Sequence, residues 1–224
     1  MRPSLLAGSR IFTDFIAYIF QTARLGKLNT GGMMIKRVFY AIVTACCLQT
    51  VALAEPPAGI VLYHKSGGEV YLLLAEHARG ERGWAAFGGG ARVGETISQT
   101  AAHKGEEESR GYYNQKDLLG LIEGQKPVMD GEFGFFFAEV DFVPAQRIGN
   151  NPIPEDEADA YGERSTFAWI PYSAVVPHLG AKLEREKKYE IDPLYLPKGS
   201  RTKWLWRAWL SNMNKAADNN QLPW

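Results

Sequence analysis

The sequence predicts an α+β fold, in which a mixed β-sheet packs with helices and a helical extension follows at the C-terminus. The chain has 224 residues, of which 46% are hydrophobic and 12% aromatic, so it can bury a core, and disordered and fibrous classes are excluded. Short runs rich in Val, Ile, Leu, Tyr and Phe are separated by turn residues. Helical segments interrupt these runs without a regular strand–helix–strand repeat, which favours a mixed sheet over a parallel one.

The N-terminal region has the three-part form of a secretory signal peptide at residues 33–54. Lys36 and Arg37 are followed by 17 uncharged residues, which end in Ala-Leu-Ala before Glu55. This run is at the lower limit for a membrane span, so a cleaved signal is favoured over an anchor. We therefore expect a periplasmic or secreted protein, with a cytoplasmic chain as the alternative. Lipidation at Cys46 is a second alternative, and membrane contact is expected only through the signal or such an anchor.

Charge and cysteine distribution divide the chain further. Residues 1–32 are expected to be an over-extended N-terminus, because such signals start at the first methionine. Residues 55–180 hold 10 basic and 19 acidic residues and form the predicted domain, whereas the Trp-rich extension 181–224 holds 9 basic and 5 acidic residues. Lys plus Arg equals Asp plus Glu over the whole chain, at 25 each, so no specific nucleic-acid partner is expected. The part after residue 54 lacks cysteine, which suits an oxidising compartment.

The first half of the predicted domain begins with a β-hairpin. Residues 59–64 and 69–76 are apolar runs joined by Lys-Ser-Gly-Gly. Residues 84–87 and a run of three glycines at 88–90 follow. Residues 96–110 lack proline and are rich in Ala, Gln, Lys and Glu, which predicts a helix despite Gly105. Residues 117–123 and 132–142 are predicted strands, the second with four phenylalanines for the core.

The second half of the chain begins with an acidic loop at 149–164. A short strand is predicted at 166–170 and a helix at 172–179, with Pro171 near its first turn. In the extension, large apolar residues at 205, 206, 209, 210 and 213 have approximate helical spacing, which predicts an amphipathic helix docked on the domain. Attachment to a membrane surface and stacking on a nucleotide or polynucleotide are the alternatives for this helix.

One segment carries the chemistry. Gly88-Gly89-Gly90-Ala91-Arg92-Val93-Gly94-Glu95 is followed by a helix that ends in Glu106-Glu107-Glu108-Ser109-Arg110-Gly111. This pattern resembles the Nudix box, G-x5-E-x7-R-E-U-x-E-E-x-G-U, with Gly89 as the first glycine, Glu95 as the first glutamate, and Glu107 and Glu108 as the glutamate pair. The resemblance covers roughly residues 57–178 and implies a mixed sheet sandwiched between helices.

The segment also departs from the Nudix box. His103 stands at the arginine position, Lys104 at a glutamate, Gly105 at the bulky residue, Arg110 at the second glycine and Gly111 at the last bulky residue. On a helix, positions 104, 107 and 108 share a face. An ammonium at 104 should repel a divalent cation unless it turns into solvent, or it neutralises substrate phosphate. His103 is expected to hydrogen-bond Glu95 in place of the arginine.

The resemblance implies the function and its residues. Nudix enzymes cleave the pyrophosphate bond of nucleoside diphosphate derivatives with Mg²⁺ or Mn²⁺, here with water as nucleophile and a small-molecule nucleotide as substrate. Glu107, Glu108 and the backbone of Gly89 are the expected metal ligands. Together with these two glutamates, Glu95 is an expected catalytic-site residue, either as a positioning residue or as a further ligand. Lys104, Arg92 and Trp169 are candidates for substrate binding, and Glu155 and Glu157 for a loop acid.

Two further hypotheses compete with this enzyme. The departures at His103 and Lys104 favour a catalytically degraded Nudix module that binds a nucleotide or a protein partner. The basic, Trp-rich extension favours, more weakly, an interaction protein of the cell envelope.

Overall fold

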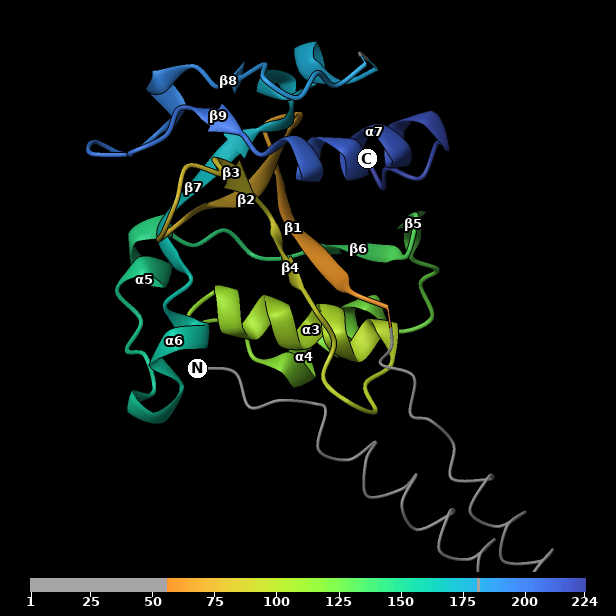
Figure 1. The fold of residues 1–224 in the computed structure, drawn as a ribbon, viewed down its shortest axis with the longest axis vertical. Helices are drawn as coiled ribbons and strands as arrows, with labels where there is room; N and C mark the ends of the chain where they lie inside the picture. Colours follow the sequence, from red (N-terminus) through yellow and green to blue (C-terminus); the bar gives the residue numbers. More distant parts are fainter. Residues whose placement is uncertain (1–55, 181) are drawn as a thin grey trace, which may run out of the picture. The chain divides into compact units, whose positions relative to one another are not determined.

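A computed structural model describes residues 56–180 and 182–224 of the chain, and the predicted segments 1–32 and 33–54 lie outside these residues. The fold is α+β, as the sequence predicts, with a nine-stranded mixed sheet and helices on its faces (Figure 1). The strands are β1 (Ala58–Ser66), β2 (Glu69–His77), β3 (Trp84–Ala85), β4 (Phe87–Gly89), β5 (Val128–Asp130), β6 (Phe133–Glu139), β7 (Arg164–Pro171), β8 (Tyr189–Glu190) and β9 (Trp204–Leu205).

The sheet has the order β5-β6-β1-β2-β3-β9-β8, with β4 paired to β1 and β7 paired to β2. The predicted hairpin is confirmed, because β1 and β2 pair antiparallel through the tight turn at Gly67 and Gly68, both with positive φ. Strand β1 also pairs in parallel with β6 and antiparallel with β4. Strand β4 thereby places the glycine run beside the centre of the sheet.

The helix that carries the acidic pair is α3 (Ile97–Glu108), as predicted. Thr96 and Gln99 form a capping box at its N-terminus, which satisfies two backbone N–H groups that the helix leaves free. Gly105 is required by packing, because a Cβ atom there would lie 2.5 Å from Leu118 Cδ1 and 2.9 Å from Ile60 Cγ2. The helix therefore tolerates the unfavourable glycine in exchange for a close approach to β1 and its neighbouring helix.

The predicted strand at 117–123 is wrong, since these residues lie in or just after helix α4 (Gln115–Ile122). The Asn114 side chain accepts the N–H of Asp117 and caps the helix. Leu118 and Ile122, four residues apart, are buried on one face. The apolar run is too short to show a helical period, and the capping residue Asn114 distinguishes the helix from a strand.

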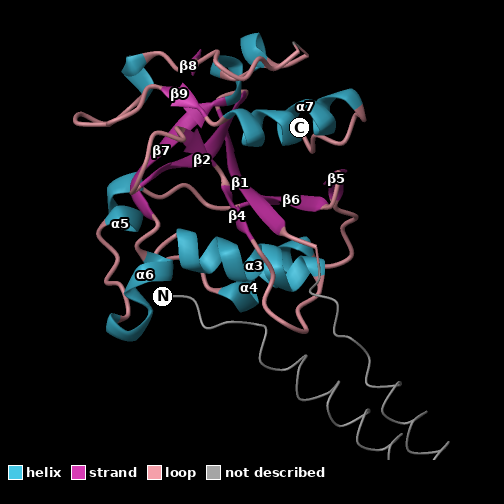
Figure 2. Ribbon diagram, in the orientation of Figure 1, coloured by secondary structure: helices cyan, strands magenta, loops and turns pink. Residues whose placement is uncertain are grey.

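Helices cover both faces of the sheet (Figure 2). One buried cluster joins α3 and α4 to one face through Ala101, Ala102, Leu118 and Phe136. The second joins α7 (Arg207–Asp218) to the other face through Trp209, Leu210 and Met213. The predicted amphipathic helix is thus confirmed as a docked helix, and β9 adds the extension to the sheet by pairing with β3.

The remaining segments are short. Helix α5 (Ala145–Gly149) precedes the acidic loop, which contains η1 (Glu155–Glu157) and α6 (Ala158–Tyr161). The predicted helix at 172–179 is replaced by two 3-10 turns, η2 (Tyr172–Ala174) and η3 (Val176–His178), and η4 (Pro193–Tyr195) follows in the extension. Pro177 inside the predicted helix explains the interruption. Among residues 56–180 and 182–224, no helix has the length and apolar character needed to cross a membrane.

Candidate functional site

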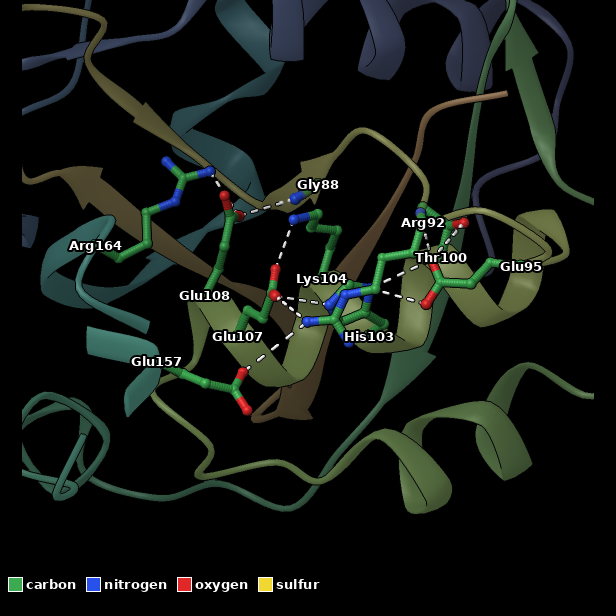
Figure 3. A network of polar contacts seen from close by, with 10 residues as sticks. All are labelled: Gly88, Arg92, Glu95, Thr100, His103, Lys104, Glu107, Glu108, Glu157 and Arg164. Carbon is green, nitrogen blue, oxygen red and sulfur yellow. Dashed lines mark hydrogen bonds and ion pairs between the residues drawn. The ribbon is translucent and has the colours of Figure 1, made fainter. Parts of the chain in front are cut away.

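Glu108, the last residue of α3, forms a buried ion pair. Its Oε2 accepts the N–H of Gly88 and Nη2 of Arg164, both at 2.8 Å (Figure 3). Glu108 is 3% exposed and Arg164 is 1% exposed. Burial raises the pKa of the Glu108 carboxyl, and the Arg164 guanidinium opposes that rise. These contacts tie the end of α3 to the glycine run and to β7.

Arg164 belongs to this buried polar network, although the sequence pattern does not predict it. Its Nη2 also donates to the Ala86 carbonyl at 3.0 Å, and its Nη1 lies 2.9 Å from both ring nitrogens of His77. Burial, together with the Arg164 charge, lowers the pKa of His77 to about 4. At neutral pH the ring is therefore uncharged, so its Nδ1 can donate to the Gly83 carbonyl, 3.2 Å away, and its Nε2 can accept from Arg164. The sequence offers one signal, an arginine three residues before the apolar run 167–171, since a buried arginine needs a partner.

Glu107 is surrounded by nitrogen-bearing side chains. Its Oε2 lies 2.5 Å from Lys104 Nζ, while its Oε1 lies 2.8 Å from Arg92 Nη2 and 2.7 Å from His103 Nε2. Burial raises the pKa of the Glu107 carboxyl, but the contacts with Lys104 and His103 outweigh it and hold the pKa below its usual range. Glu107 is thus ionised at neutral pH, and both of its oxygens face nitrogen donors.

Glu95 and His103 make the contact that the sequence predicts. His103 Nδ1 lies 3.0 Å from Glu95 Oε1, and the ring is 2% exposed. Glu95 Oε2 accepts the N–H of Arg92 at 2.9 Å and the Thr100 hydroxyl at 3.2 Å. Burial raises the pKa of Glu95, but these partners outweigh it and lower the pKa overall. His103 therefore joins the loop carboxylate Glu95 to Glu107 on the helix.

Lys104 does not turn into solvent. Its chain lies over the backbone of Gly89, where a Cβ atom would be 3.1 Å from Lys104 Cε and 3.2 Å from Cδ. Its side chain is 20% exposed, and its ammonium points to Glu107 (Figure 3). The ammonium thus lies beside two of the three groups, Gly89 and Glu107, that the Nudix resemblance assigns to a metal ion.

The structure brings some of the other predicted residues together. Arg92, with a side chain 57% exposed, bridges Glu107 to Glu157, whose Oε2 is 3.9 Å away. Glu155 is exposed and makes no polar contact with another side chain within the described residues. Trp169 is directed elsewhere, because its indole donates to the Val143 carbonyl at 2.7 Å and its ring packs against Phe142. Arg92 and Glu157 therefore belong to the site, whereas Trp169 packs β7 against the segment after β6.

This arrangement does not fit a divalent cation. Mg²⁺ needs several oxygen ligands that are free to coordinate it, but Glu95, Glu107, Glu108 and Glu157 each contact a basic side chain already. An incoming ion would also meet the charges of Lys104, Arg92 and Arg164. Within residues 56–180 and 182–224, no three His, Cys, Asp or Glu side chains are arranged to hold a metal ion. The metal-ligand roles predicted for Glu107, Glu108 and Gly89 thus require a different arrangement of these side chains.

A cavity of about 760 Å³ opens on the other side of the glycine run. Its walls come from β1, from Gly88 to Gly90, and from the N-terminal half of α7. Trp206, Arg207, Trp209 and Asn212 contribute aromatic, guanidinium and amide groups to its lining. The buried indole N–H of Trp209 has no acceptor within the described residues. This volume and mixture of groups are typical of a small-molecule site.

Comparison with known proteins identifies the family. The sequence model of the NUDIX domain matches residues 54–192. Similar solved structures include an Ap4A hydrolase from C. elegans, with 15% identity, a TM-score of 0.35 and coverage of 54% of this chain and 82% of that one. A MutT/nudix family protein from Enterococcus faecalis has 12% identity, a TM-score of 0.40 and coverage of 80% and 69%. No curated protein matches the sequence. Because the NUDIX match spans more than half of the chain and includes the box at 89–111, this chain belongs to the Nudix hydrolase family.

Proposed function

We propose that this chain is a Nudix module that binds a nucleoside diphosphate derivative and does not hydrolyse it by a divalent-metal mechanism. The observation that carries this proposal is that cationic side chains and an aromatic cavity both adjoin the glycine run. Lys104 lies against Gly89 with Arg92 on the same glutamate, and the cavity lined by Trp206 and Trp209 borders Gly88 to Gly90. Cations beside an aromatic cavity match a ligand with an anionic diphosphate and a planar base.

The chemistry of the lining supports each part of the ligand. Tryptophan rings can stack on a base, and the unpaired N–H of Trp209 can donate to a base acceptor. Arg92 is half-exposed and held by Glu107 and Glu157, so its guanidinium is positioned and still reachable by a phosphate oxygen. Gly90 leaves the backbone accessible, since nothing lies within 4 Å of a Cβ atom placed there.

Metal-dependent pyrophosphohydrolysis is the second candidate, because the glutamate pair is retained in register. Glu107 and Glu108 stand at the end of α3, and Glu108 contacts the glycine run directly. If a divalent ion displaced Lys104 and Arg92 from Glu107, these carboxylates and the Gly89 backbone would be its expected ligands. The ion would then supply charge neutralisation at the pyrophosphate, as the family resemblance implies.

Calorimetric titration with ADP and a turnover assay of ADP and ADP-ribose, each with Mg²⁺ or Mn²⁺, distinguish the two candidates. The proposal predicts ADP binding without release of phosphate or nucleoside monophosphate. Turnover that depends on metal and is lost in Glu108→Gln would establish the second candidate instead. The charge-reversed control Lys116→Glu changes an exposed residue of α4 and should behave like the unmodified protein.

A further inference from the structure

The position of Lys104 bears on how a diphosphate is held. Its Nζ lies 2.5 Å from Glu107 Oε2, and its Cε and Cδ would lie 3.1 and 3.2 Å from a Cβ atom placed at Gly89. In the family pattern these are groups that a metal ion would contact, and position 104 itself would carry a carboxylate. This chain therefore replaces one expected ligand by a cation and places that cation beside two of the other expected ligands, Gly89 and Glu107.

The carboxylates around Lys104 already have cationic partners. Glu107 faces Lys104, Arg92 and His103, and Glu108 faces Arg164. Adding a divalent ion would leave an excess of positive charge in a largely buried cluster, which is unfavourable. Removing only the Lys104 charge, by contrast, would leave Glu107 with Arg92 and His103 as partners.

We infer that the Lys104 ammonium is a built-in substitute for the divalent cation, so that a diphosphate group binds beside Gly89 through Lys104 and Arg92 without metal. This inference rests on the proposed function for the identity of the ligand. The exclusion of metal does not depend on the proposed function, because metal binding can be measured with the metal alone. A lysine is a suitable substitute because its compact ammonium is a strong point-charge donor to phosphate oxygens.

The first arm of the test measures metal binding without nucleotide. Mn²⁺ is titrated into the full chain and followed by electron paramagnetic resonance, using the unmodified protein, Lys104→Glu and Lys116→Glu. We expect Mn²⁺ binding at this site only in Lys104→Glu, at least tenfold tighter than in the other two proteins. Mn²⁺ binding to the unmodified protein that is lost in Glu108→Gln would overturn the inference, whether or not nucleotides bind.

The second arm measures the ligand. ADP and inorganic pyrophosphate are titrated calorimetrically in EDTA and in Mg²⁺, with the unmodified protein and Lys104→Met, which keeps the packing on Gly89 but removes the charge. Equal affinity in both buffers, and a loss of at least tenfold in Lys104→Met, are expected. Binding that requires Mg²⁺ would overturn the inference. If neither probe binds in either buffer, the proposed function fails, and the Mn²⁺ arm still decides the role of Lys104.

Discussion

Replacing Arg164 by methionine tests the buried pair on which the site is built. The guanidinium and the Glu108 carboxylate are 2.8 Å apart and almost fully buried, so Arg164→Met leaves a buried carboxylate without its cation. Breaking such a pair costs about 3–5 kcal/mol. Loss of the bond to the Ala86 carbonyl adds about 1 kcal/mol, and the apolar methionine recovers part of this, so we expect a loss of about 4 kcal/mol in the free energy of unfolding at pH 7.

A double-mutant cycle with Glu108→Gln isolates the pair. The glutamine keeps an acceptor for the Gly88 N–H but has no charge, so the double variant should be more stable than Arg164→Met alone, with a coupling energy of about 2 kcal/mol. Because burial already raises the pKa of Glu108, the carboxyl without its arginine partner loses its buried charge by taking up a proton. The folded state then holds the proton more tightly than the unfolded state, so the defect of Arg164→Met should shrink from pH 8 to pH 5.

Urea unfolding of the full chain, monitored by tryptophan fluorescence, gives these free energies. Arg185→Met is the matched control, because the Arg185 side chain is 86% exposed and its ion pair with Glu186, at 3.8 Å, is solvated. This variant should change the free energy of unfolding by under about 0.5 kcal/mol. A loss under about 1 kcal/mol in Arg164→Met, or no coupling with Glu108→Gln, would refute the reasoning. If Arg164→Met does not fold at pH 7, comparison of the double variant with Glu108→Gln still measures the loss of Arg164.

Three further predictions concern the framework of the site. His77 has a pKa of about 4 in the folded state against an ordinary value of 6.5, so only the neutral ring favours the folded state. The free energy of unfolding should therefore fall by up to about 3 kcal/mol as the pH drops from 7 to 4. In thermal melts, His77→Gln should reduce this dependence on pH. Gly59→Ala should destabilise by about 1–3 kcal/mol in urea, because its Cβ atom would lie 2.5 Å from the Phe87 carbonyl oxygen, whereas Gly120→Ala, with free space, should stabilise α4 by about 0.5–1 kcal/mol. Trp209→Ala should lower the free energy of unfolding by about 3–5 kcal/mol in the same assay. An unchanged free energy would refute the docking of α7 on the sheet.

The elements with a clear period or turn signal could be predicted from the sequence. The hairpin around Gly67 and Gly68 and the capped helix after Thr96 follow from local chemistry, and the structure contains both. The segment 117–123 could not be assigned by composition, because Leu118 and Ile122 are compatible with a short strand as well as a helix. Only the helix cap at Asn114 distinguishes a helix from a short strand in this segment.

The site was predictable where partners are close in sequence and unpredictable where they are not. The His103–Glu95 contact follows from the spacing of a loop and the helix behind it, and it is confirmed. The partner of Glu108 comes from Arg164, 56 residues later, and depends on how β7 pairs with β2. Whether Lys104 turns into solvent or toward Glu107 is likewise decided by packing on Gly89, which no local pattern contains.

The most direct test of the central claim is a crystal structure of the full chain with ADP and Mn²⁺, recorded with anomalous scattering. We predict the diphosphate of ADP beside Gly89, within hydrogen-bonding distance of Lys104 and Arg92, and no anomalous peak at Glu107 or Glu108. An anomalous peak coordinated by Glu108 and the Gly89 backbone, with Lys104 displaced from Glu107, would contradict the account.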